Sequence, residues 1–241
     1  MNSPLNMAAA IAYAPRFEGA RAALGKALYW RYRLGQTRRR AAAVLERVGD
    51  APLLVLPGVL NPRLMRSGAF MAAQLRSMPP APQAQVLDMG TGSGVCALAV
   101  ARAGCHVTAV DINPDAVRCA RINALLNQLD HKIEILQGDL FAPVAQRRFD
   151  LILFNPPFVH GTAADMADRA WRSTDVAPRF AAGLAQHLTP HGAALVLLSS
   201  YGDAPRFLQQ FERCALRLSL IAQRSYVNEK LTLLRVQAGT P

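Results

Sequence analysis

Two patterns of apolar and polar positions alternate along the chain from residue 83 onward. Short apolar runs, typical of buried strands, are separated by longer stretches with apolar residues at helical spacing. We predict strands at Gln85–Met89, His106–Ile112, Lys132–Leu136, Phe149–Phe154, Ala193–Leu198, Leu216–Ala222 and Leu231–Val236. We predict helices at Val95–Ala103, Pro114–Asn127, Val176–Leu188 and Ala204–Cys214. This alternation favours an α/β fold with a largely parallel sheet.

The first 82 residues follow a different pattern. The stretch Ala20–Arg47 contains no proline, and its apolar residues recur at roughly helical spacing, which predicts one or two basic helices. An apolar segment bounded by prolines, Pro52–Pro62, is followed by a helix-like run, Ser67–Ser77, and by a proline-rich linker. We therefore expect a basic helical N-terminal extension over residues 1–50, a connecting segment and linker over 51–82, and the main domain over 83–241.

The composition sets limits on the class of protein. The chain has 241 residues, of which 51% are hydrophobic, and this is ample for one hydrophobic core. Its four cysteines are scattered and form no CxxC pair, so neither a disulfide framework nor a metal site is indicated. No apolar run reaches the roughly 18 residues that span a bilayer. These features predict a cytoplasmic protein without a membrane segment.

The formal net charge of +11 favours an anionic partner. Nine basic but only three acidic residues fall within residues 1–50. Arginines at 31, 33 and 38–40 are interleaved with Trp30 and Tyr32, which is typical of an arm that contacts phosphates and stacks on bases. An exposed helix face would produce the same pattern. We expect this extension to contact a nucleic acid, a ribosome or a translation factor, and a small-molecule substrate for the protein stays open.

A glycine-rich turn follows the first predicted strand of the main domain. Gly90, Gly92 and Gly94 lie between this strand and the next helix. Glycine allows the backbone to approach a ligand without interference from Cβ, so the turn predicts a nucleotide-like ligand at the carboxyl end of the strand. The dinucleotide spacing GxGxxG would require glycine where the chain has Val95. A tight turn that binds nothing is the alternative.

Two aspartates end the next two predicted strands. Asp111 lies about 20 residues beyond the glycines, where a carboxylate can accept hydrogen bonds from two ribose hydroxyls. The alternative role for Asp111 is to cap the following helix, but Asn113 is the better cap and leaves Asp111 for a ligand. Asp139 is placed to accept a hydrogen bond from an adenine amino group, and a solvated turn aspartate is its alternative role.

The sequence Asn155-Pro156-Pro157-Phe158 directly follows the apolar strand that ends at residue 154. Proline fixes φ and donates no backbone hydrogen bond, so this segment should be a rigid rim. The side-chain oxygen of Asn155 and the carbonyl of Pro156 are two acceptors for a planar NH2 group, and Phe158 offers a face for stacking. Such a site would orient an amide or amine nitrogen toward a methyl donor. A plain strand end is the alternative.

Together these segments resemble the class I S-adenosylmethionine-dependent methyltransferases. Their first motif matches Asp88–Gly94, their second ends at Asp111, and their amino-methylating members carry Asn-Pro-Pro-Tyr/Phe. The loop at 155–158 is similar to that of the small-methyltransferase group, which includes HemK-like release-factor glutamine methyltransferases and RNA N-methyltransferases. The resemblance covers roughly residues 54–236. It implies a Rossmann-like fold, a mostly parallel seven-stranded sheet with helices on both faces, and S-adenosyl-L-methionine as cofactor.

The resemblance also implies roles for individual residues. The cofactor-binding residues would be Asp88, Gly90, Gly92, Asp111, Ile112 and Asp139, and the catalytic residues Asn155, Pro156 and Phe158. Further candidates for substrate contact are Pro157, His160, Trp171 and Arg172, with His160 as a proton acceptor and the last two in a variable lid. A structural histidine and a surface helix anchored by tryptophan are the alternatives for these positions.

Two positions depart from the family pattern. Phe158 replaces the tyrosine of HemK-like enzymes, and His191 stands where the family usually has glycine. Three functions are compatible with the chain: an N-methyltransferase acting on a nucleic acid or a translation-associated protein glutamine, a small-molecule N-methyltransferase, and a non-catalytic RNA-binding protein. The glycine turn, Asp111 and Asn155 together disfavour the last, because a binding module needs no acceptor loop beside a cofactor site.

Overall fold

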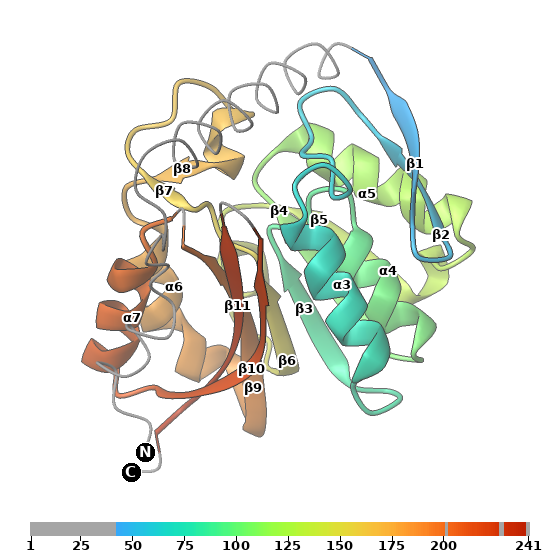
Figure 1. The fold of residues 1–241 in the computed structure, drawn as a ribbon. Helices are drawn as coiled ribbons and strands as arrows, with labels where there is room; N and C mark the ends of the chain where they lie inside the picture. The colour runs from blue at the N-terminus through green and yellow to red at the C-terminus, as the bar shows by residue number, and fades with distance from the viewer. Residues whose placement is uncertain (1–41, 201, 227–228, 240–241) are drawn as a thin grey trace.

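A seven-stranded sheet lies at the centre of the protein (Figure 1). The computed structural model describes residues 42–200, 202–226 and 229–239. The strands are β3 (Gln85–Met89), β4 (His106–Asp111), β5 (Ile133–Gln137), β6 (Phe149–Phe154), β9 (Leu188–Ser199), β10 (Arg217–Ser225) and β11 (Lys230–Gln237). They lie in the order β10-β11-β9-β6-β3-β4-β5, and only β11 pairs antiparallel with its neighbours. The predicted mostly parallel sheet is confirmed.

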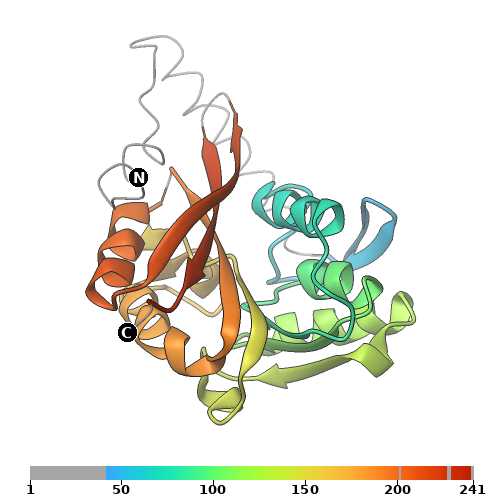
Figure 2. The same ribbon diagram turned by 90° about the horizontal axis from the view of Figure 1, so that it is seen from below.

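Helices cover both faces of this sheet (Figures 1 and 2). One face is covered by α3 (Ser67–Ser77), α4 (Val95–Arg102) and α5 (Pro114–Leu126). The other face is covered by α6 (Val176–Leu184) and α7 (Ala204–Arg213). The sheet therefore has a hydrophobic core on each side, as the resemblance to class I methyltransferases implied.

The apolar run of β6 shows why these strands lack a polar face. Leu153 belongs to the core beneath α3, α4 and α5, whereas Ile152 and Phe154 belong to the core beneath α6 and α7. Successive side chains of a strand point to opposite faces, so a strand buried on both faces is apolar at every position. Phe154 packs against Phe180 of α6 with 4.3 Å between ring centroids. This packing holds the end of β6, from which Asn155 projects.

A hairpin, rather than a helix, begins the described part of the chain. Strand β1 (Val44–Val48) pairs antiparallel with β2 (Ala51–Val55), and Gly49 has a φ of 63° in the turn between them. The predicted helix through Arg47 is therefore wrong for this stretch, and its earlier residues lie outside the described range. Leu53 of β2 is fully buried in the core that contains α4. This long-range packing, together with the β-branched ends of β1, favours the strand.

The boundary between α6 and β9 also differs from the prediction. The helix ends at Leu184 and a 3₁₀ turn follows, so that β9 begins at Leu188 instead of residue 193. Leu188 pairs with Phe149 of β6 and is buried. The residues that follow it, including the exposed His191, are mostly polar, so the pattern of apolar residues does not predict a strand there. The register with β6 shifts between Leu188 and Ala193, and the Thr189 hydroxyl donates to Asp150 of β6 (3.0 Å).

The hairpin depends on one buried asparagine of α5. Asn123 donates from Nδ2 to the carbonyl oxygens of Leu54 (2.8 Å) and Ser93 (2.9 Å), and its Oδ1 accepts from the Leu54 N–H (2.7 Å). We expect Asn123→Ala to lower the free energy of unfolding by roughly 2–4 kcal/mol, because buried backbone groups lose their partners. Urea denaturation would measure this. Arg118→Ala, on the exposed side of the same helix, is the control, and an equal loss in both variants would contradict the assignment.

Candidate cofactor and acceptor site

A pocket opens at the carboxyl ends of β3, β4, β5 and β6. Parallel strands bring their ends to one edge of a sheet, and ligands of open α/β sheets bind there. The walls come mainly from the segments 58–68, 89–95, 110–113, 138–140, 154–157 and 166–170. The predicted residues that line the pocket are Gly90, Gly92, Asp111, Ile112, Asp139, Asn155 and Pro157. The topology therefore brings the glycine turn, the two strand-end aspartates and the asparagine loop together.

The glycines of the turn meet different steric requirements. Gly90, Gly92 and Gly94 have φ values of 66°, 56° and 81°, in the left-handed region. A Cβ added to Gly92 would meet no atom within 4 Å and would occupy space in the pocket. A Cβ added to Gly94 would lie 3.3 Å from the Cβ of Ala120. Gly92 thus keeps room for a ligand, whereas Gly94 allows α5 to pack closely.

Asp88 holds the glycine turn from below and does not line the pocket. Its Oδ2 accepts hydrogen bonds from the Thr91 hydroxyl (2.7 Å) and from the Ala97 N–H (3.0 Å). Burial raises the pKa of Asp88 to about 7, because loss of hydration outweighs these two hydrogen bonds. Asp88 therefore acts on the pocket through the shape of the turn.

Asp111 connects the end of β4 to the glycine turn. Its Oδ2 accepts from the Gly92 N–H (2.8 Å) and its Oδ1 from the Asn113 N–H (2.9 Å). Burial raises the pKa of Asp111, and the backbone N–H groups of Asn113, Gly92 and Ile112 oppose this. Asn113 caps α5 by accepting from the Asp115 N–H (2.9 Å), as predicted. The carboxylate of Asp111 is thus held in place on the pocket wall.

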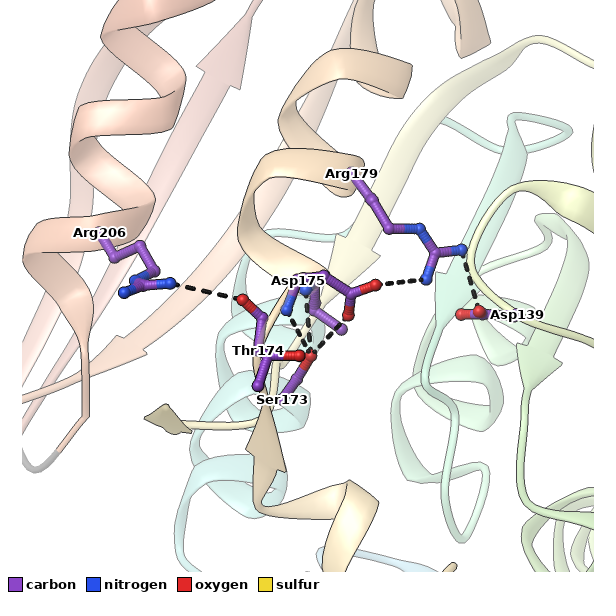
Figure 3. Close-up of polar contacts among 7 residues, drawn as sticks. Asp139, Ser173, Thr174, Asp175, Arg179 and Arg206 are labelled. Atoms are coloured by element: carbon purple, nitrogen blue, oxygen red, sulfur yellow. Dashed lines mark hydrogen bonds and ion pairs between the residues drawn. The ribbon is translucent and has the colours of Figure 1, made fainter. Parts of the chain in front are cut away.

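Asp139 lies on the rim, in an ion pair that the sequence did not suggest. Its Oδ2 is 2.9 Å from Nη2 of Arg179, which comes from α6 (Figure 3). The same guanidinium reaches Asp175 at 3.2 Å. Both side chains of the Asp139 pair are about two-fifths exposed, so solvent screens the interaction. The ion pair with Arg179 therefore orients the Asp139 carboxylate and contributes little to the stability of the fold.

Asn155 has a buried acceptor without a partner. Its Nδ2 donates to the hydroxyl of Ser67 (3.2 Å), at the start of α3. Its Oδ1 is buried and accepts no hydrogen bond from the described residues. A buried polar atom of this kind costs free energy unless a ligand satisfies it. Asn155 lines the pocket, so a small rotation of its side chain would present Oδ1 to a donor that enters there.

The other predicted acceptor residues lie outside this pocket. Pro156 and Phe158 are not among its lining residues, and the carbonyl of Phe158 accepts from the Asp203 N–H (2.7 Å). His160 belongs to a short strand, β7 (Val159–His160), that pairs with β8 (Arg172–Ser173). Arg172 forms an ion pair with Asp168 at 3.1 Å. These residues support the base of the loop between β7 and β8.

Several pocket residues were not predicted as contacts. Met166, Arg169 and Ala170 line the pocket from the loop between β7 and β8. Met65 and Ser67 line it from the segment before α3. The lid residues that the resemblance implied, Trp171 and Arg172, are not among the lining residues. Nothing in the local sequence distinguishes Arg169 from its exposed neighbours.

Two other features bear on the class of protein. The part of the chain that the structure describes has no group of three or more His, Cys, Asp or Glu side chains that could hold a metal ion. Within the same residues, every helix is too short or too polar to cross a bilayer.

Known proteins share both the sequence pattern and the fold. A release factor glutamine methyltransferase of Shewanella oneidensis is 36% identical over 146 residues, which cover 58% of this chain and 49% of that protein. A ribosomal RNA small subunit methyltransferase C of Alcanivorax borkumensis is 34% identical over 150 residues, covering 62% and 42%. The T. thermophilus 16S rRNA methyltransferase RsmC, solved with AdoMet and guanosine, superposes with a TM-score of 0.57 at 23% identity, covering 79% and 49%.

The fold and the pocket define a Rossmann-like class I methyltransferase, the class that uses S-adenosylmethionine. The family match extends over residues 54–219, so the chain belongs to the methyltransferase small domain family. The chain spans about half the length of the curated relatives it matches.

The raised pKa of Asp88 predicts a pH-dependent stability. The folded protein takes up this proton near pH 7, whereas the unfolded chain does so near 3.8, so the group stabilises the fold as pH falls. Between pH 8 and pH 5 it should add roughly 2–3 kcal/mol, and Asp88→Asn should lack this increment. Urea denaturation of both proteins at the two pH values measures the difference. The same pH dependence in both would show that Asp88 is not the titrating group.

Proposed function

We propose that this protein transfers a methyl group from S-adenosylmethionine to the side-chain amide nitrogen of a glutamine in a translation factor. The observation that carries the proposal is the buried Oδ1 of Asn155, which has no partner among the described residues and belongs to the same pocket as Asp111 and the glycine turn. The NH2 group of an amide side chain is a suitable donor for such an acceptor. The relatives named as release factor glutamine methyltransferases support glutamine as the acceptor residue.

The residues of the pocket fit the cofactor. The open space at Gly92 would admit its amino acid portion or ribose close to the backbone, and the fixed carboxylate of Asp111 would accept from ribose hydroxyls. Ile112 would pack against the adenine and Asp139 would accept from its amino group, since both lie on the same wall. Asp88 would contribute indirectly by holding the turn. When bound, the cofactor supplies an electrophilic methyl group on a sulfonium sulfur.

The protein's part in the reaction is to orient the acceptor nitrogen. An amide nitrogen delocalises its lone pair into the carbonyl, so it is a weak nucleophile. A hydrogen bond from its NH2 group to Asn155 Oδ1 would favour the pyramidal nitrogen of the transition state. The nitrogen would release a proton to solvent once it carries the methyl group. Asn155 needs no change of charge in this step.

An exocyclic amino group of an RNA base is the second candidate acceptor. It has the same planar NH2 geometry, and one relative is named as a ribosomal RNA methyltransferase. Arg66, the residue before Ser67, and Arg224 are both exposed. Their guanidinium carbons lie over the ring of Tyr226, at 4.7 and 5.2 Å from its centroid, respectively. Paired guanidinium groups at this edge of the sheet suit a phosphate.

A translation-related acceptor of either kind would place the reaction in the cytoplasm, and the basic extension over residues 1–50 is proposed to assist in binding it.

Asp111→Ala should weaken cofactor binding by roughly 2–4 kcal/mol, because the ribose hydroxyls lose their acceptor. The variant also removes the partner of the Gly92 N–H, so Asp111→Asn, which keeps an acceptor at one oxygen, is the milder companion. Calorimetric titration with S-adenosylhomocysteine measures both. Unchanged affinity in Asp111→Ala would remove this residue from the cofactor site.

Asn155→Ala should lower the rate of methyl transfer by about a hundredfold or more while cofactor affinity stays nearly unchanged, because only the transition-state acceptor is lost. Asn155→Asp keeps an acceptor oxygen and should retain part of the activity. The measurement is single-turnover transfer from labelled S-adenosylmethionine. Wild-type turnover in Asn155→Ala would contradict the mechanism.

The acceptor is identified in the same assay. A purified peptide chain release factor and total ribosomal RNA are offered separately, and the label is traced to a glutamine or to a base. Label in glutamine supports the proposal, and label only in RNA supports the second candidate. No transfer to either would overturn both.

A further inference from the structure

Arg179 joins the rim of the cofactor pocket to the turn that precedes α6 (Figure 3). One side of its guanidinium contacts Asp139, which follows β5, and the other contacts Asp175, one residue before the helix begins. Within the described residues, Arg179 is the one cation at ion-pair distance from Asp139, and Asp139 Oδ1 accepts no hydrogen bond. The orientation of the Asp139 carboxylate therefore depends on a residue of another element.

Arg179 itself is held by the turn over residues 173–175. The hydroxyl of Ser173 donates to Asp175 Oδ1 (3.1 Å) and accepts from the Asp175 N–H (3.2 Å). From α7, Arg206 donates to the carbonyl of Thr174 (3.4 Å), as Figure 3 shows. The position of Asp175 is thus fixed by contacts other than the one it makes with Arg179. A planar guanidinium that binds two fixed groups loses its freedom to rotate.

This geometry suits orientation better than it suits stability. The ion pair between Arg179 and Asp139 is half exposed, and such pairs contribute little to folding. A carboxylate with one oxygen on an arginine presents the other in a defined direction. A donor in the pocket would meet this second oxygen, whereas an acceptor in the same place would be repelled by its charge.

We infer that Arg179 is a positioning residue that sets the Asp139 carboxylate to distinguish an amino group from an oxo group on the purine of the cofactor. The inference rests on the proposed cofactor site. It assigns the discrimination to a residue of α6 that lies 40 positions after the aspartate in the sequence. Loss of Arg179 would leave Asp139 in place but free to turn away from the pocket.

The test compares the binding of S-adenosylhomocysteine with that of its analogue in which hypoxanthine replaces adenine. Calorimetry gives the ratio of the two dissociation constants. The wild-type protein should prefer the adenine compound by about tenfold or more, as expected for one charged hydrogen bond. Arg179→Gln should reduce this preference to roughly threefold or less, and Arg179→Lys, which keeps the cation, should restore part of it.

Arg147→Gln is the matched control, since it removes an equally exposed arginine from an ion pair with Glu134, away from the pocket. It should keep the wild-type preference. A full preference in Arg179→Gln, or an equal loss in Arg147→Gln, would overturn the inference. Equal wild-type affinity for both compounds would overturn it while leaving the cofactor site intact. No wild-type binding of either compound would overturn the cofactor proposal as well.

Discussion

Parallel pairing of β3 with β4 on one side and β6 on the other is the constraint on which the rest of the structure depends. It places three strand ends at one edge of the sheet. The glycine turn begins directly after β3, Asp111 is the last residue of β4, and Asn155 directly follows β6. Because the strands share a direction, groups that lie far apart in the sequence face one pocket. The chemistry of the site is thus a consequence of strand order.

Packing on the two faces of the sheet then sets the details. On one face, α3 brings Ser67 to Asn155, and α5 brings Asn123 to the backbone of the glycine turn and of β2. On the other face, α6 brings Arg179 to the rim at Asp139. Each contact uses a polar side chain to fix a neighbour that faces the pocket. The pocket is held by both layers of helices and not by its loops alone.

Much of the fold could be predicted because its signals are local. The strands at Gln85–Met89 and Phe149–Phe154 have the predicted bounds, since each is a mostly apolar run that ends at a glycine turn or at Asn155-Pro156. The start of β9 was missed because polar or exposed residues separate Leu188 from the apolar run that begins at Ala193. The hairpin strand β1 was missed because its partner and the core beneath it, not its own pattern, decide between helix and strand.

The sequence by itself determined the residue types at the site: glycines where the backbone must turn, carboxylates at strand ends, and an asparagine made rigid by two prolines. Each of these signals depends only on residues that are adjacent in the sequence, so it can be recognised without the tertiary structure. Only the tertiary structure decided which of them share a pocket. Ser67 and Asn155 are separated by 88 positions in the sequence and yet form a hydrogen bond. Phe158, in the same loop as Asn155, does not line the pocket. Contacts between distant elements depend on how the helices pack, and local patterns do not record this.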